Sequence, residues 1–110
     1  MDQVLRAVTA LFGRERKVLL KMPSGWVGRP YDGLFKLVRV EIVDGSLFLE
    51  LDESMVLTFT GPVEVDMAGK DLWLSGFSEL QWDWHDFGNS QKVHHVTFRG
   101  GVVELIAPVG

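Results

Sequence analysis

The pattern of hydrophobic and polar positions changes once along the chain, near Gly13. Before Gly13, apolar residues recur every three or four positions, as they do on one face of an α-helix. Gly13 can end such a helix, because glycine readily adopts the left-handed conformation that follows a last helical turn. The sequence therefore predicts one amphipathic helix over about residues 2–13. Its apolar face consists of Val4, Leu5, Val8, Leu11 and Phe12.

Beyond Gly13, apolar and polar residues alternate, and Gly or Pro interrupts the alternation every eight to twelve residues. This spacing is typical of antiparallel strands joined by turns. We predict a mainly β protein, an antiparallel β-sandwich or flattened barrel of about nine strands built from consecutive hairpins, with one N-terminal helix. The expected strands lie near residues 16–22, 34–43, 46–52, 55–60, 62–67, 71–75, 78–86, 92–99 and 102–107.

The length of 110 residues fits a single domain over residues 1–110, with a β region over about residues 16–107. The net charge of −4 gives a surface that repels phosphate backbones, so we expect no nucleic-acid partner. No apolar run approaches the roughly twenty residues of a membrane helix, so we expect no membrane partner. The absence of cysteine excludes disulfides and thiolate chemistry. With a start unlike a signal peptide, these features predict a cytoplasmic protein.

Glycine-containing turns predict the register of three hairpins. Two-residue turns at residues 44–45, 69–70 and 100–101 fix which residues face one another across each strand pair. In each hairpin, apolar residues then meet on one face and polar residues on the other, as a half-buried sheet requires. The expected pairs are Ile42 with Leu47, Val40 with Leu49, Val38 with Leu51 and Arg39 with Glu50; Met67 with Leu72 and Val65 with Leu74; and Phe98 with Val103 and Val96 with Leu105.

Residues 80–96 form a fourth hairpin with two competing registers. A tight turn at Gly88 and Asn89 mixes polar and apolar residues on one face, whereas a five-residue loop over residues 87–91 keeps apolar with apolar. We choose the longer loop. The expected pairs are Asp86 with Lys92, Trp84 with His94, Trp82 with Val96, Leu80 with Phe98 and Asp83 with His95.

The longer loop divides the three histidines between the two faces of the hairpin. His94 shares a face with Trp82 and Trp84, whereas His85 and His95 share the other face with Asp83. Nitrogen and oxygen ligands of this kind suit zinc, iron or manganese. The candidate metal set is Asp83, His85, His95 and Glu104, with Glu104 expected one strand beyond His95. A solvated polar strand face is the competing interpretation.

A second candidate surface consists of apolar residues that the registers place on the outward face. Phe48, Val56 and Trp73 fall there, and Trp26, in the long connection over residues 23–33, can join them. We expect such an apolar patch to be covered by the protein's own helix, by a second copy of the chain or by a ligand such as a sugar. The candidate ligand or interaction surface is therefore Trp26, Phe48 and Trp73.

These observations predict a non-enzymatic binding or protein-interaction module that self-associates or binds another protein. A small metal-dependent enzyme that uses the histidine and aspartate cluster is the alternative, and a carbohydrate-binding domain is a third. No serine lies in a Gly-x-Ser-x-Gly context, and the sequence assigns no catalytic residue. We expect no cofactor other than the divalent metal of the alternative.

Overall fold

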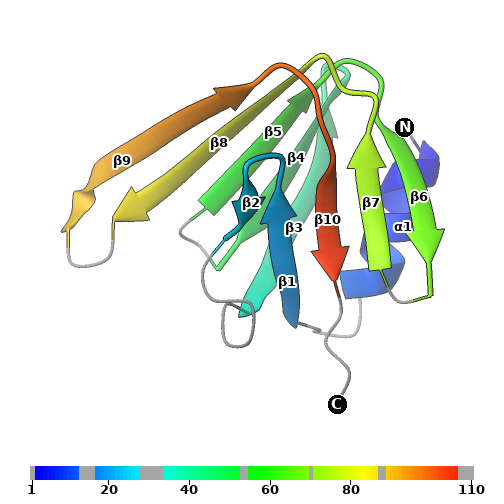
Figure 1. Ribbon diagram of the computed structural model, residues 1–110, viewed down its shortest axis with the longest axis horizontal. Helices are drawn as coiled ribbons and strands as arrows, with labels where there is room; N and C mark the ends of the chain where they lie inside the picture. The colour runs from blue at the N-terminus through cyan, green and yellow to red at the C-terminus, as the bar shows by residue number, and fades with distance from the viewer. Residues whose placement is uncertain are drawn as a thin grey trace.

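The computed structural model describes residues 2–12, 17–27, 34–52, 55–69, 71–86 and 89–106 (Figure 1). These residues contain one helix and ten strands, which confirms the mainly β fold with an N-terminal helix. No helix in these ranges is long and apolar enough to span a membrane. The elements are α1 (Asp2–Phe12), β1 (Lys17–Met22), β2 (Gly25–Trp26), β3 (Leu34–Val43), β4 (Ser46–Leu51), β5 (Met55–Thr60), β6 (Glu64–Ala68), β7 (Asp71–Ser75), β8 (Glu79–Asp86), β9 (Asn89–Phe98) and β10 (Val103–Ile106).

The strands form one antiparallel sheet in the order β6-β7-β10-β1-β3-β4-β5-β8-β9, and β2 pairs with β1. Strand β3 is the corner of this sheet. Its first residues pair with β1, and from Leu37 onward it pairs with β4. The sheet therefore folds into a front layer of β1, β10, β7 and β6 and a back layer of β4, β5, β8 and β9 (Figure 1). It does not close, because β6 and β9 end it on opposite sides.

The core lies between the two layers and follows the predicted alternation. Every second residue of β4, β5 and β7 is buried, and the intervening residues face outward. Phe59 packs edge-to-face on Phe77, with ring centroids 5.1 Å apart. Helix α1 contacts β3 and β6 and adds Val4 and Val8 to this core. The amphipathic helix thus covers the core near the β6 side of the molecule.

The first two hairpins have the predicted register, with one exception. The pairs of Val40 with Leu49, Ile42 with Leu47 and Arg39 with Glu50 are confirmed, and so are the two pairs of the β6–β7 hairpin. The pairing of Val38 with Leu51 is wrong. A bulge between Leu37 and Arg39 pairs Leu37 with Leu51, and Val38 is 45% exposed. The extra residue lies where β3 leaves β1, and a bulge of this kind bends its strand.

The third predicted hairpin, at residues 100–101, is wrong. Strand β10 pairs with β1 and β7 in the front layer, whereas β9 pairs with β8 in the back layer. Gly100 and Gly101 have φ of 123° and 111°, a region that favours glycine. A Cβ added at Gly101 would lie only 2.9 Å from the Pro23 Cβ. The two glycines therefore carry the chain between the layers, past Pro23.

The fourth hairpin has the predicted register along most of its length. Leu80, Trp82, Asp83 and Trp84 have the expected partners on β9. Its tip differs, because a register shift after His85 pairs Asp86 with Asn89 instead of Lys92, so the expected five-residue loop is wrong. Phe87 and Gly88 lie outside the described residues. Strand β2 was not expected in the long connection, whose residues 28–33 are also outside the described ranges.

Candidate functional site

Strands β8 and β9 form a ribbon, residues 79–86 and 89–98, at the end of the sheet (Figure 1). In the described residues β9 has one ladder partner, β8, so its other edge is unpaired. The ribbon extends away from the front layer (Figure 1). Its inner face continues the core face of the sheet, and its outer face continues the surface of the back layer.

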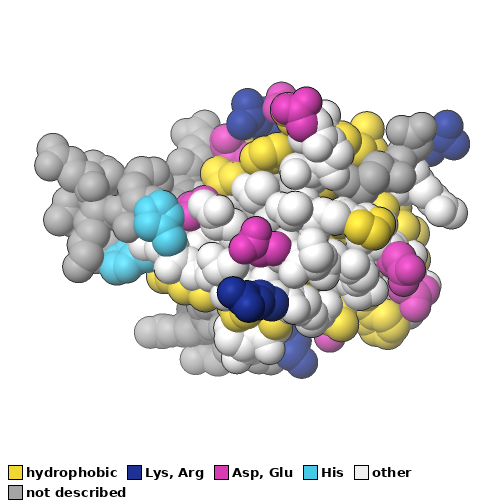
Figure 2. Space-filling model, turned by 90° about the horizontal axis from the view of Figure 1, so that it is seen from above, with side chains coloured by type: hydrophobic (Ala, Val, Ile, Leu, Met, Phe, Trp, Pro, Cys, Tyr) yellow, Lys and Arg dark blue, Asp and Glu magenta, His cyan; other side chains and the backbone are white. Residues whose placement is uncertain are grey.

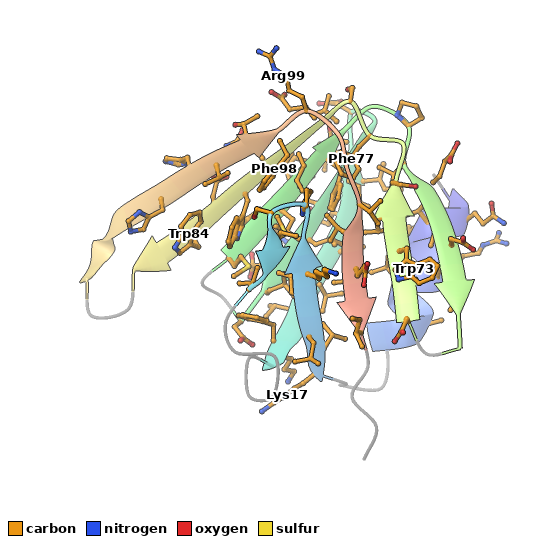
Figure 3. All side chains as sticks on the ribbon, viewed as in Figure 1. Lys17, Trp73, Phe77, Trp84, Phe98 and Arg99 are labelled. Atoms are coloured by element: carbon orange, nitrogen blue, oxygen red, sulfur yellow. The ribbon has the colours of Figure 1, made fainter. Side chains whose placement is uncertain are left out.

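The inner face of the ribbon carries three stacked rings, which we call the aromatic row: Trp82, Trp84 and His94. The two indoles are stacked with centroids 4.3 Å apart and planes at 28°. His94 stacks on Trp84 at 5.0 Å and 18°. All three side chains are half-buried, and the two indoles pack against the edge of the core together with Phe98 (Figure 3). The row is therefore partly exposed aromatic surface.

Composition changes along the ribbon in step with burial. On β8 the inner positions run from Leu80, which is fully buried, to Trp82 and Trp84, which are half-buried. On β9 they run from Phe98 to His94 and are all half-buried. On β8 an aliphatic residue thus gives way to two indoles, and the Nε1 of Trp82 is buried with no described acceptor. The two tryptophans are therefore covered only in part.

The outer face of the ribbon brings Asp83 and His95 together, as the register predicted. His95 Nδ1 contacts Asp83 Oδ1 directly. Gln81 Nε2 donates to both carboxylate oxygens of Asp83, at 3.2 and 3.0 Å. The His95 side chain is 64% exposed and that of Asp83 is 23% exposed. The described histidine side chains lie at the surface of this end of the molecule (Figure 2).

The other two members of the predicted metal set are not shown beside this pair. The His85 side chain lies outside the described residues, although its backbone pairs with Val93. Glu104 is in the front layer, where its register partners are Lys21 and Trp73. Its expected position beside His95 depended on the third hairpin, which is wrong. In the part of the chain that the structure describes, no three His, Asp or Glu residues form a metal-binding group, and metal binding stays a prediction.

The predicted interaction surface divides between the two layers. Phe48 is on β4 in the back layer and Trp73 is on β7 in the front layer, so they do not form one patch. In register, Trp73 lies between Asp66 and Glu104, and its Nε1 is buried with no described acceptor (Figure 3). Trp26 pairs with Lys21 through its backbone, and its side chain is outside the described residues. The predicted interaction surface of Trp26, Phe48 and Trp73 is therefore not one continuous surface.

The unpaired edge of β9 has a distinctive composition. Strand β9 is ten residues long, twice the length of β6 at the opposite end of the sheet. It contains Lys92, His94 and His95, is followed by Arg99, and has no Asp or Glu, in a chain whose net charge is −4. Within the described residues, no backbone hydrogen bond outside the ladders involves β9.

Sequence reasoning missed this edge because it placed β10 beside β9. The available signal was the composition of β9 itself, which has two histidines and a lysine in an acidic chain. Comparison of this chain with protein-family models, with curated proteins and with solved structures finds no match.

Proposed function

We propose that this protein is a non-enzymatic protein-interaction module that binds a partner polypeptide as an additional strand along β9. The observation that carries the proposal is the unpaired edge of this ten-residue strand, which borders a half-buried aromatic row. Both features occur at the same end of the molecule, outside the region between the two layers.

The edge supplies the main-chain part of the proposed interaction. In an edge strand, every second residue directs its backbone N–H and C=O groups away from the ladder. An added strand can satisfy these groups, and such hydrogen bonds provide affinity with little dependence on sequence. Strand β6 is shorter and has α1 packed against it, so β9 is the better acceptor for an added strand.

The inner face supplies the side-chain part. A strand added beside β9 directs alternate side chains next to His94, Val96 and Phe98, all of which are half-buried. Apolar side chains there would remove more of the aromatic row from water, and burial of apolar surface contributes roughly 25 cal/mol per Å². Tryptophan is enriched among the residues that dominate binding energies at interfaces. The ribbon therefore offers backbone hydrogen bonds that depend little on the partner's sequence and apolar contacts that depend on it.

A metal-dependent activity is the second candidate, and the contact of His95 with Asp83 favours it. A carboxylate on one nitrogen of an imidazole orients the ring and leaves its other nitrogen available to a metal or a proton. This pair is on the outer face, whereas the aromatic row is on the inner face. The two candidate functions therefore predict responses on opposite sides of the ribbon.

Residue-resolved NMR tests both candidates. The chain is titrated with ten-residue peptides of alternating apolar and polar residues, matched in length to β9. Strand addition predicts shifts in the β9 amides and in the Trp84 indole, and no response to the same peptides N-methylated at alternate residues, because those cannot complete a ladder. Equal binding of the N-methylated peptides would contradict strand addition. A zinc titration that shifts His95 and Asp83 would support the metal candidate.

A further inference from the structure

We infer that the strand that β9 binds is acidic on its outer face, with Asp or Glu at alternate positions and apolar residues between them. This inference rests on the proposed function and specifies the chemistry of the partner. On the outer face, β9 and the residue that follows it supply His95 and Arg99, and β9 contains no Asp or Glu. An edge without acidic residues selects for a partner that has them.

His95 and Thr97 are exposed on the outer side of β9. Arg99, which is also exposed, follows the end of the strand (Figure 3). His95 uses Nδ1 for Asp83, so its Nε2 can donate to a carboxylate of an added strand when both ring nitrogens carry a hydrogen. Arg99 offers a guanidinium, the side chain best suited to bind a carboxylate through two parallel hydrogen bonds. Carboxylates at alternate positions of an added strand can therefore reach both His95 and Arg99.

The carboxylate of Asp83 does not reverse this preference. Neighbouring strands lie about 4.8 Å apart, so an added strand is one spacing from β9 and two spacings, roughly 10 Å, from β8. A separation of roughly 10 Å is close to the Debye length at physiological salt, so repulsion from Asp83 is largely screened. Asp83 is also already bound by Gln81 and His95. The guanidinium of Arg99, which has no ion-pair partner among the described residues, therefore sets the sign of the interaction.

The same cations count against a second copy of β9 as the added strand. Two paired copies of β9 would offer no carboxylate to His95 or Arg99, because neither strand contains Asp or Glu. Like charges that share an interface disfavour association. An extended acidic segment of another protein has no such conflict. Its apolar residues, on the opposite side of the strand, would lie next to Val96 and Phe98.

Fluorescence anisotropy with three labelled peptides tests the inference. Each peptide has valine at every second position, alternating with Glu, Thr or Lys. We expect the Glu peptide to bind at least about tenfold more tightly than the Lys peptide at physiological salt, and the difference to shrink as salt is added, because it is electrostatic. The Thr peptide should lie between them.

A charge reversal at Arg99 and a matched control at Lys17 test whether Arg99 binds the carboxylates of the peptide. Arg99→Glu should weaken binding of the Glu peptide about tenfold and strengthen binding of the Lys peptide, because it reverses the charge at the edge. Lys17→Glu makes the same change of charge at an exposed position on β1, away from β9, and should alter binding less than about twofold. Circular dichroism of both variants checks that the sheet is intact.

The outcomes separate this inference from the proposed function. If all three peptides bind β9 equally well, strand addition stands and the acidic preference is overturned. If none of them binds, both are overturned. If sedimentation shows that the unmodified chain self-associates and the Glu peptide does not dissociate it, a second copy occupies the edge and the inference is overturned. Tight binding of the Glu peptide that Arg99→Glu weakens about tenfold would support it.

Discussion

The two ends of the sheet differ in how they are completed. At one end, β6 has only five residues, and α1 packs against it and adds Val4 and Val8 to the core. At the other end, β9 has ten residues, and in the described part of the chain its one ladder partner is β8. The first end is finished by a helix of the same chain. The second retains a half-buried aromatic row and an unpaired edge.

This difference follows the composition of the two ends. Val4 and Val8 are aliphatic and lose nearly all of their exposure. Trp82, Trp84 and His94 combine apolar surface with a polar atom and keep partial contact with solvent. Side chains of the second kind tolerate both a wet and a covered state. The apolar residues at the β6 end are thus buried by the chain itself. Under the proposed function, the aromatic row at the β9 end is covered further when a partner binds.

Among the substitutions considered, we expect the largest loss in the free energy of unfolding where helix α1 packs on the core. Val8→Asp places a carboxylate at a fully buried position with no partner, so we expect a loss of about 4 kcal/mol in the free energy of unfolding. Thr9→Asp, on the exposed side of the same helix, should change it by less than about 0.5 kcal/mol. Chemical denaturation measures both values. Similar losses for the two variants would mean that α1 is not packed as described.

The next largest effect is expected where the chain crosses from β9 to β10. Gly101→Ala adds a methyl group 2.9 Å from Pro23 at a φ of 111°, and we expect a loss of about 3 kcal/mol. Gly45→Ala, with a φ of 79° and no atom within 4 Å of the added carbon, should lose about 1 kcal/mol. Comparison of the two denaturation midpoints isolates the contact with Pro23. Equal losses in the free energy of unfolding would mean that the backbone conformation alone, and not the contact with Pro23, destabilises Gly101→Ala.

A smaller effect is expected in the aromatic row. Trp84→Ala should lower the free energy of unfolding by about 2 kcal/mol, less than truncation of a fully buried tryptophan, because the side chain is half-buried. It should also abolish the circular dichroism signal of the coupled indoles, which are 4.3 Å apart. Trp73→Phe, in the other layer, should leave that signal in place. Persistence of the signal in Trp84→Ala would contradict the stacking.

The smallest effect is expected in the middle of the sheet, on its outer face. Arg39 and Glu50 approach to 3.6 Å, and the arginine is 55% exposed. Solvent screens such pairs, so Arg39→Ala should change the free energy of unfolding by about 0.5 kcal/mol. A double-mutant cycle with Glu50→Gln measures the coupling. A coupling above about 1 kcal/mol would show that this part of the outer face is shielded from solvent.

Local pattern was sufficient to predict the helix, most strand positions and the registers of three hairpins. Asp44 with Gly45 specifies a tight turn, which sets Val40 opposite Leu49 and Ile42 opposite Leu47 on the core face. The separation of His94 from His95 follows from the same alternation. For the candidate site, the sequence therefore predicted the pairing of Asp83 with His95 and the shared face of the two tryptophans.

The remaining features depend on distant parts of the chain. Two consecutive glycines suit both a tight turn and a crossing between layers, and residues 100–101 form the second because β1 and β7 provide partners for β10. The bulge at Val38 depends likewise on β3 serving both layers. The error at residues 100–101 displaced Glu104 from the predicted metal set. It also concealed the unpaired edge of β9.

Amide hydrogen exchange, resolved by residue on the dilute free protein, tests most directly whether β9 is an open edge. Amides of the interior strand β4 should all be protected. In β9, protection should alternate, with the amides directed at β8 protected and those directed away from it exchanging at close to the rate of an unfolded chain. Uniform protection along β9 would show that the edge is already covered and would contradict the account.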